Sequence, residues 1–222
     1  MNVPRITIFS TMTVDGRIAS YAGYSKLSCK YDLLRLHWLR AESDAVMVGA
    51  GTVIADNPSL RLKYFNGKDP DRIIVDGLLR SPVNSRVYTE NPQKTVIMTT
   101  GLAPEAAINS LTSRGVRVVV SGRGPQIDMK VMAGRLWEMG YRKVMVEGGG
   151  RLNWSLISSG VVDEVRITVS PYVFGAGRSV FDGEGFRTTL DGPVLKLKSS
   201  QICECGNEIH AIYSPRKIGF QR

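Results

Sequence analysis

The alternation of short apolar runs with helical segments constrains the fold of this chain more than any other feature. Over residues 5–158, short runs rich in valine, isoleucine and methionine alternate with stretches whose apolar residues recur at helical spacing. This order predicts a parallel sheet with helices packed on its faces. We expect strands at residues 5–11, 45–49, 72–75, 95–99, 116–120 and 143–146, and helices at residues 29–40, 106–113, 129–139 and 152–158.

The pattern changes after Gly160. Residues 164–169, 194–202 and 208–213 are typical of strands, and no helical segment separates them, which favours antiparallel pairing. The predicted fold class is therefore α/β, with a mixed sheet made of a parallel, helix-flanked portion and antiparallel C-terminal strands. No linker or repeat divides the chain, so we expect a single domain over residues 1–222, with residues 216–222 as a basic tail.

Several protein classes are excluded by composition. No apolar run approaches the ~18 residues that a membrane helix needs. The first ten residues are too short and too mixed for a secretory signal. The 3 cysteines are an odd number, which argues against a disulfide framework and fits a reducing compartment. We therefore expect a cytoplasmic protein that does not bind membranes.

The charge balance indicates an anionic partner. There are 29 Lys and Arg against 20 Asp and Glu, a net charge of +9, which suits nucleic acid and phosphorylated small molecules alike. A nucleic-acid-binding protein is therefore one hypothesis. The basic residues are dispersed, however, and no DNA- or RNA-binding motif is present, so we expect no nucleic-acid partner.

The cysteines and histidines do not predict a metal site. Cys203 and Cys205 are two residues apart, so on a strand they would point to the same face. A metal would need further ligands, and only Cys29, His37 and His210 remain. We expect these residues to be structural and the protein to bind no metal.

Glycine-rich transitions from strand to helix are the best candidates for a binding site. Glycines follow the predicted strands at Gly49 and at residues 148–150. Glycine permits positive φ and close approach of backbone N–H groups, and a helix N-terminus attracts phosphate. Neither segment has the spacing of a P-loop or of the dinucleotide fingerprint. A third strand end, at Gly77, is followed by Arg80, a cation suited to the 2′-phosphate that distinguishes NADPH from NADH.

Taken in order along the chain, these segments resemble a known family, the riboflavin-pathway reductases with a dihydrofolate-reductase-like fold. The resemblance covers nearly the whole chain. The matching segments are STMTVDGRIA at residues 10–19, RA at 40–41, VGAGTV at 48–53, DNP at 56–58, IVDG at 74–77, VEGGG at 146–150, VDE at 162–164 and SPYVFG at 170–175.

The resemblance implies a function. It implies a cytoplasmic, homodimeric, NADPH-dependent reductase of riboflavin biosynthesis, for which NADH would be a weaker cofactor. The substrate would be 2,5-diamino-6-ribosylamino-4(3H)-pyrimidinone 5′-phosphate, whose ribosylamino side chain is reduced to ribitylamino by hydride transfer to C1′. Two alternatives stay open: the substrate could be the already deaminated 5-amino-6-ribosylamino-uracil 5′-phosphate, or the chain could be a basic nucleotide- or nucleic-acid-binding protein. A folate-type reductase on the same fold is a weaker rival, because phosphate clamps such as Arg40 and Lys63 would have no purpose in it.

The resemblance also implies roles for individual residues. The cofactor-binding residues would be Thr52, Asp56, Gly77, Leu78, Leu79, Arg80, Ile127, Gly148, Gly149, Gly150, Arg151 and Leu152. The substrate-binding residues would be Arg40, Leu60, Lys63 and Glu147, with Arg40 and Lys63 as clamps for the 5′-phosphate. The catalytic proton donor is unknown, with Asp15 and Glu147 as candidates.

Two departures from the family pattern affect this interpretation. Gly77 stands where a serine is usual, so only backbone donors remain there. The H-x-E and P-C-x-x-C signature of the deaminase domain in bifunctional bacterial relatives is absent. We therefore expect a stand-alone reductase, which favours the pathway order in which reduction precedes deamination.

Overall fold

A large mixed sheet forms the centre of the molecule. The computed structural model describes residues 2–216, and its main sheet has nine strands in the order β10-β11-β8-β1-β7-β3-β4-β5-β6. The strands are β1 (Arg5–Thr13), β2 (Arg17–Ser20), β3 (Ala45–Gly49), β4 (Asp71–Val75), β5 (Thr95–Thr99), β6 (Arg117–Val120), β7 (Lys143–Val146), β8 (Glu164–Ser170), β9 (Gly177–Ser179), β10 (Leu195–Ile202) and β11 (Ile209–Pro215). From β8 to β6 all neighbours are parallel, whereas β11 pairs antiparallel with both β8 and β10.

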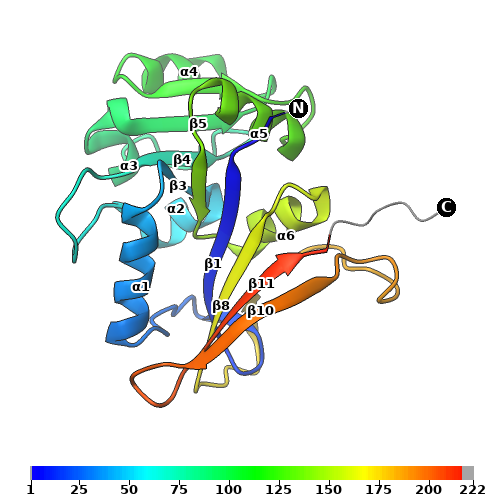
Figure 1. Ribbon diagram of the computed structural model, residues 1–222. Coiled ribbons are helices and arrows are strands. Elements are labelled where there is room, and N and C mark those ends of the chain that lie inside the picture. Colours follow the sequence, from blue (N-terminus) through cyan, green and yellow to red (C-terminus); the bar gives the residue numbers. More distant parts are fainter. Residues whose placement is uncertain (1, 217–222) are drawn as a thin grey trace.

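Helices cover both faces of this sheet (Figure 1). They are α1 (Lys30–Ala41), α2 (Ala50–Asp56), α3 (Arg86–Thr89), α4 (Glu105–Thr112), α5 (Met129–Glu138) and α6 (Gly150–Ser159), with a short 3₁₀ turn η1 (Pro92–Lys94). None of the helices within residues 2–216 has the length and apolarity that crossing a bilayer requires.

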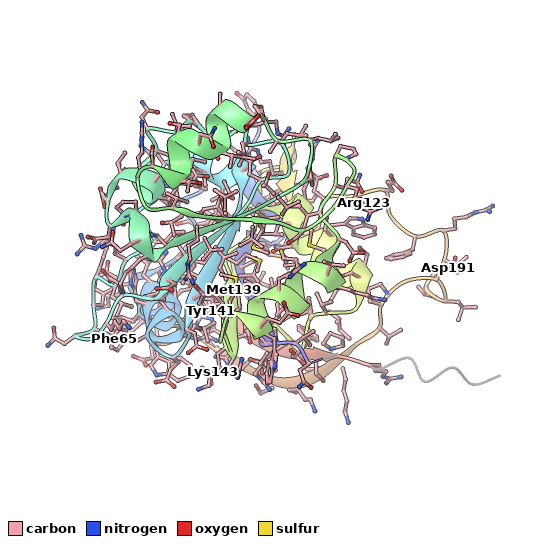
Figure 2. The ribbon with its side chains drawn as sticks, turned by 90° about the horizontal axis from the view of Figure 1, so that it is seen from above. Phe65, Arg123, Met139, Tyr141, Lys143 and Asp191 are labelled. Carbon is pink, nitrogen blue, oxygen red and sulfur yellow. The ribbon has the colours of Figure 1, made fainter. Side chains whose placement is uncertain are left out.

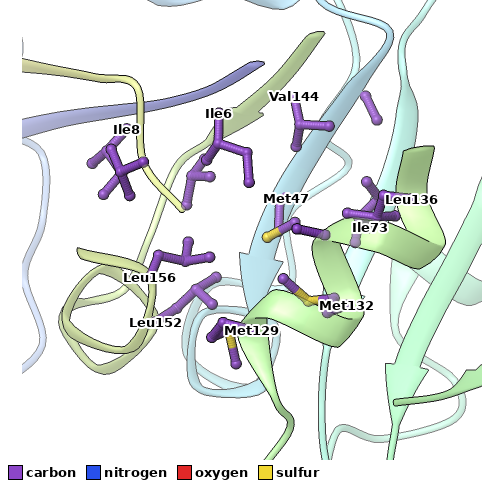
Figure 3. Close-up of a cluster of buried hydrophobic side chains, with 14 of the residues drawn as sticks. Ile6, Ile8, Met47, Ile73, Met129, Met132, Leu136, Val144, Leu152 and Leu156 are labelled. Atoms are coloured by element: carbon purple, nitrogen blue, oxygen red, sulfur yellow. The ribbon is translucent and has the colours of Figure 1, made fainter. Parts of the chain in front are cut away.

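The alternation of side chains along the strands divides the core into two clusters. On β3, Met47 faces one side of the sheet and Val46 and Val48 face the other, as the period of two requires. On the Met47 side, α5 and α6 pack against the sheet (Figure 3). On the opposite side, the sheet contacts α1, α2, α3 and α4 through Leu39, Val53, Val87, Tyr88 and Leu111.

Local sequence signals explain where the helices begin and end. The Asp128 side chain accepts hydrogen bonds from the N–H groups of Lys130 and Val131 and so caps the start of α5. Gly160 ends α6 in the left-handed conformation, with a φ of 75°.

The predicted α/β mixed sheet is confirmed, and the predicted elements agree with the observed ones to within about two residues at most ends. Three details of the prediction are wrong. Residues 164–169 belong to β8, which pairs parallel with β1 as well as antiparallel with β11. The short elements β2, β9 and α3 are absent from the prediction, whereas α2 is the helix implied after Gly49. Cys203 and Cys205 do not lie on a strand, because β10 ends at Ile202 and both cysteines are in the turn before β11.

The predicted basic tail falls almost wholly outside the described residues, since only Arg216 of residues 216–222 is described. The single-domain interpretation stays a prediction.

Candidate active site at the carboxyl edge of the parallel strands

The predicted glycine segments meet along one edge of the sheet. Strands β7, β3, β4, β5 and β6 are consecutive neighbours and parallel, so the loops that follow them lie side by side. Backbone hydrogen bonds join these loops, from Gly49 N to Gly148 O at 2.9 Å, from Thr100 N to Gly77 O at 3.1 Å and from Gly101 N to Gly122 O at 3.0 Å. In open α/β sheets, ligands bind outside the carboxyl ends of the strands, so this edge is the candidate site.

Two of the three glycines in the Gly148–Gly150 segment are required, each for a different reason. Gly148 has a φ of 84°, which favours glycine, whereas Gly149 and Gly150 do not have a positive φ. A Cβ on Gly149 would have only the Thr52 hydroxyl oxygen nearby, at 3.5 Å. A Cβ on Gly150 would overlap the Ser179 carbonyl oxygen. The expected need for a positive φ is therefore confirmed for Gly148, whereas Gly150 is required because a Cβ would not fit.

The start of α6 presents backbone N–H donors that have no partner within the helix. Gly149 is the N-cap of α6 and supplies no side-chain acceptor, and the first N–H groups of any helix lack partners within the helix. The predicted residues Arg151 and Leu152 belong to this first turn. Thr52 lies beside it, and its hydroxyl oxygen accepts a hydrogen bond from Gly149 N at 3.0 Å. Together these groups suit an anionic ligand such as a phosphate.

A second loop, after β4, is held in shape by a buried aspartate. Asp76 Oδ2 accepts hydrogen bonds from the Ser81 N–H and hydroxyl, each at 2.7 Å, while Oδ1 has no partner among the described residues. A Cβ on Gly77 would lie 2.7 Å from the Pro125 carbonyl oxygen. The loop after β6 thus approaches too closely for a serine at position 77, which explains that departure from the family pattern.

Two arginines at this edge carry no internal ion pair. Arg80 is exposed and follows Leu78, which is on the surface, and Leu79, which is half-buried with a φ of 50°. Arg123, in the loop after β6, is also exposed, and neither arginine has an ion-pair partner within residues 2–216. Figure 2 shows Arg123 well apart from Lys143, at the opposite end of the strands. Sequence reasoning missed Arg123, although a cation next to a glycine after a strand is the same signal that singled out Arg80.

Two predicted contact residues are in the hydrophobic core. The Ile127 side chain is 8% exposed and belongs to the cluster beneath α5, so the expected adenine contact is not supported. Leu60 is 2% exposed and packs on the opposite face of the sheet, so its side chain belongs to the core.

Arg40 and Glu147 bind each other, although sequence analysis gave them separate roles. Arg40 Nε donates to Glu147 Oε1 at 2.5 Å and Arg40 Nη2 to Oε2 at 2.7 Å. Arg40 Nη1 also donates to the Arg61 carbonyl oxygen at 2.8 Å. The prediction of Arg40 as a free phosphate clamp is therefore not supported, and its guanidinium orients the Glu147 carboxylate at the end of β7.

His37 holds the segment that contains Lys63. Its Nδ1 accepts a hydrogen bond from the Lys63 backbone N–H at 3.2 Å, and its ring meets Tyr64 edge-on. Burial, reinforced by the charge of Arg40, lowers the pKa of His37 to about 4, so the imidazole is neutral at pH 7. The Lys63 side chain is exposed, in keeping with its predicted role as a phosphate clamp.

The remaining predicted carboxylates differ in their surroundings. Asp15 accepts hydrogen bonds from the Thr13 hydroxyl at 2.6 Å and from the N–H groups of Phe174 and Gly175. The hydrogen bond from Thr13, followed by those two, lowers the pKa of Asp15, which makes it a poor proton donor. Asp56 lies near Arg178 of β9, and desolvation raises its pKa.

A cavity of about 240 Å³ lies away from this edge, between α1 and the β10–β11 hairpin. No predicted cofactor or substrate residue lines it.

Comparison with known proteins decides the family. Residues 4–211 match the model of the RibD C-terminal domain. The chain belongs to this family. It is 39% identical over 202 residues to a protein of Methanothermobacter thermautotrophicus named 2,5-diamino-6-ribosylamino-4(3H)-pyrimidinone 5′-phosphate reductase, covering 89% of this chain and 92% of the relative. A protein of Aquifex aeolicus with the same name is 34% identical over 206 residues, covering 90% of this chain and 92% of the relative.

Solved structures agree on the fold of this RibD C-terminal domain. RibD of Acinetobacter baumannii superposes with a TM-score of 0.82 at 24% identity, over 96% of this chain and 58% of that protein. A dihydrofolate reductase of Enterococcus faecalis, complexed with NADP(H), gives a TM-score of 0.55 at 13% identity, over 96% of this chain and of that one. The dihydrofolate-reductase-like fold expected from the sequence is thereby confirmed.

Proposed function

We propose that this RibD C-terminal domain is the NADPH-dependent reductase of riboflavin biosynthesis that acts on 2,5-diamino-6-ribosylamino-4(3H)-pyrimidinone 5′-phosphate. The relatives named for this reaction cover about nine-tenths of the chain and are themselves covered to the same extent. The observation that carries the proposal is that backbone hydrogen bonds connect the glycine-containing loops at the carboxyl edge of the sheet. The exposed cations Arg80 and Arg123 lie in two of these loops.

The residues present fit a nicotinamide dinucleotide. The first N–H groups of α6 would hold its pyrophosphate, and the loops after β4 and β6 would surround the adenosine end. The unpaired Asp76 Oδ1, which is buried, provides an acceptor facing these loops. When bound, this cofactor supplies the hydride.

On the substrate side, Arg40 holds Glu147 in one orientation by two hydrogen bonds. A carboxylate has about four acceptor sites, so Glu147 retains capacity for amino or hydroxyl groups of the substrate. Lys63 is the proposed phosphate clamp. Of the two candidates, we prefer Glu147 to Asp15 as the residue that positions the proton for the nitrogen bonded to C1′, since Asp15 is bound to three donors of the protein.

Substrate reduction can be tested directly. Purified protein with NADPH should lose reduced-nicotinamide absorbance on addition of the diamino-pyrimidinone phosphate, and faster than with the amino-uracil phosphate. Consumption with dihydrofolate alone, or salt-dependent binding of an oligonucleotide without any reductase activity, would contradict the proposal.

Cofactor choice is the finer part of the proposal. Arg80→Ala and Arg123→Ala should each weaken NADPH binding by about 1.5–3 kcal/mol, the range for a charged hydrogen bond, and leave NADH binding nearly unchanged. Lys143→Ala is the matched control, because Lys143 is an exposed cation at the amino end of β7. If both arginine variants lost NADPH and NADH affinity equally, neither would be the 2′-phosphate ligand.

We also propose that the protein is a cytoplasmic homodimer. Strand β8 does not supply the interface, because it is not an edge strand and its Val165 and Ile167 pack in the core of the same chain. The antiparallel edge is β10, and exposed apolar side chains of this hairpin include Leu197, Ile202 and Ile209.

A further inference from the structure

A cluster of sulfur and oxygen ligand atoms lies outside the candidate active site. Each of its residues offers one ligand atom, and these atoms all lie within 4.8 Å of one another. We call it the cysteine cluster, and it consists of Cys29, Cys203, Cys205 and Glu208. In the sheet order, β8 and β1 separate the hairpin that carries it from β7 and its glycine segment.

Two distant parts of the chain form this cluster. Cys29 is the N-cap of α1, whereas the other three residues belong to the β10–β11 turn. Figure 1 shows this turn beside one end of α1. The sulfur atoms of Cys29 and Cys203 are 3.6 Å apart, and Cys29 N–H donates to Glu208 Oε1 at 2.7 Å.

An unpaired oxygen points to a missing ligand. Glu208 is 2% exposed, and its Oε2 has no hydrogen-bond partner among the described residues. A buried carboxylate oxygen without a partner is costly, unless a cation or donor faces it. The neighbouring Asp32 shows the contrast, because it accepts hydrogen bonds from Thr11 and Thr168 at 2.6 Å each.

The sulfur spacing fits a metal ion better than a disulfide. Tetrahedral zinc with Zn–S bonds of about 2.3 Å places its sulfur ligands about 3.8 Å apart. A disulfide needs about 2.05 Å between sulfurs, and pairing any two cysteines would leave the third thiol beside the bond.

Backbone groups further prepare the sulfurs for metal binding. Asp32 N–H lies 3.5 Å from the Cys29 sulfur, and the N–H of Cys205 points at the Cys203 sulfur. The N–H groups of Asn207 and Glu208 point at the Cys205 sulfur. Such bonds stabilise thiolates, which are the form that binds metal.

We propose that the cysteine cluster binds one zinc ion as a structural site. Three thiolates and one carboxylate complete a tetrahedral, closed coordination sphere, with the thiol protons released to solvent on binding. The ion would tie the start of α1 to the β10–β11 turn, at the edge of the sheet.

Sequence reasoning excluded a metal because only Cys29, His37 and His210 remained as further ligands, and nothing in the sequence places Cys29 or Glu208 beside Cys203 and Cys205. In the turn, Cys203 and Cys205 lie on either side of Glu204, and Gly206 follows with a φ of 78°. That turn brings both sulfurs to Cys29, which is 174 residues away from Cys203.

Metal analysis of the full chain tests the proposal independently of reductase activity. Protein purified without chelator should contain about one zinc per chain, retained on desalting. Cobalt(II) exchanged into the wild-type protein should give the intense absorption bands of tetrahedral thiolate coordination. Cys205→Ser should lower zinc affinity by more than about 100-fold, since even residues behind the ligands contribute 10–100-fold. Glu204→Gln, in the same turn and exposed, is the matched control and should keep the zinc.

A thiol assay covers the case in which the serine variant does not fold. All 3 cysteines of the wild-type chain should resist alkylation until a chelator is added, and all should then react. Three thiols that react at once in zinc-loaded protein, a disulfide in the purified chain, or stoichiometric binding of a different metal would overturn the assignment. None of these results depends on whether the chain is a pyrimidine reductase.

Discussion

Replacing Arg40 by methionine should destabilise the protein severely, because it leaves the Glu147 carboxylate without its partner. The side chains of Arg40 and Glu147 are only 9% and 13% exposed, so the exposed-pair value of under 1 kcal/mol does not apply. Two charge-assisted hydrogen bonds, at 2.5 and 2.7 Å, are lost, each worth about 1.5–3 kcal/mol. Removing one partner of a buried pair costs about 3–5 kcal/mol.

We therefore expect Arg40→Met to lower the free energy of unfolding by about 4 kcal/mol. For a chain of 222 residues this corresponds to a fall in Tm of about 8–16 °C. Urea denaturation, followed by circular dichroism, measures the free energy. The double variant Arg40→Met with Glu147→Met should be more stable than the single variant, because it removes the buried unpaired charge.

The exposed pair Arg86–Glu90 provides the control, and Arg86→Met should cost less than about 0.5 kcal/mol. If Arg40→Met changed stability by less than about 1 kcal/mol and instead raised only the KM for the phosphorylated substrate, Arg40 would be a phosphate clamp after all. Additive losses in the double variant would likewise refute the reasoning, because they would show that the two side chains do not interact.

Three further predictions concern Gly150, His37 and the assembly of the protein. Gly150→Ala should disrupt the start of α6 through the clash with the Ser179 carbonyl oxygen and abolish cofactor binding. Gly51→Ala, with no atom within 4 Å of its Cβ, should be tolerated. Equal NADPH affinity of both variants by fluorescence titration would contradict the proposed clash. Because the pKa of His37 is lowered to about 4, protons bind the unfolded chain preferentially, so stability should fall by up to about 3 kcal/mol as the pH drops from about 6.5 to 4. In urea denaturation, His37→Asn should flatten the stability profile between about pH 6.5 and 4. Parallel profiles of the wild-type and variant proteins would show that His37 does not cause the loss of stability. Light scattering should give about twice the 24.4 kDa of one chain, and a mass of one chain at micromolar concentration would exclude the dimer.

The elements of the fold could be predicted from the sequence because their signals are local. The apolar run at β3, the glycine after α6 and the periodicity of α5 each lie within a few residues of the structure that they determine. The same local evidence distinguishes the two portions of the sheet, because helical segments separate the strands of the parallel portion and none separates the C-terminal strands. The glycine segments at the candidate site were also found in this way, since a strand end followed by glycine is a pattern of adjacent residues.

The partners of individual side chains were decided only by the tertiary structure. Arg40 and Glu147 are 107 residues apart, and nothing near either residue indicates that β7 ends beside α1. The sheet order likewise brings Cys29 to the β10–β11 turn and buries Ile127 in the core. Local periodicity determines which residues form a strand, but which strands become neighbours depends on how all the buried faces pack together, and that information is distributed over the whole chain.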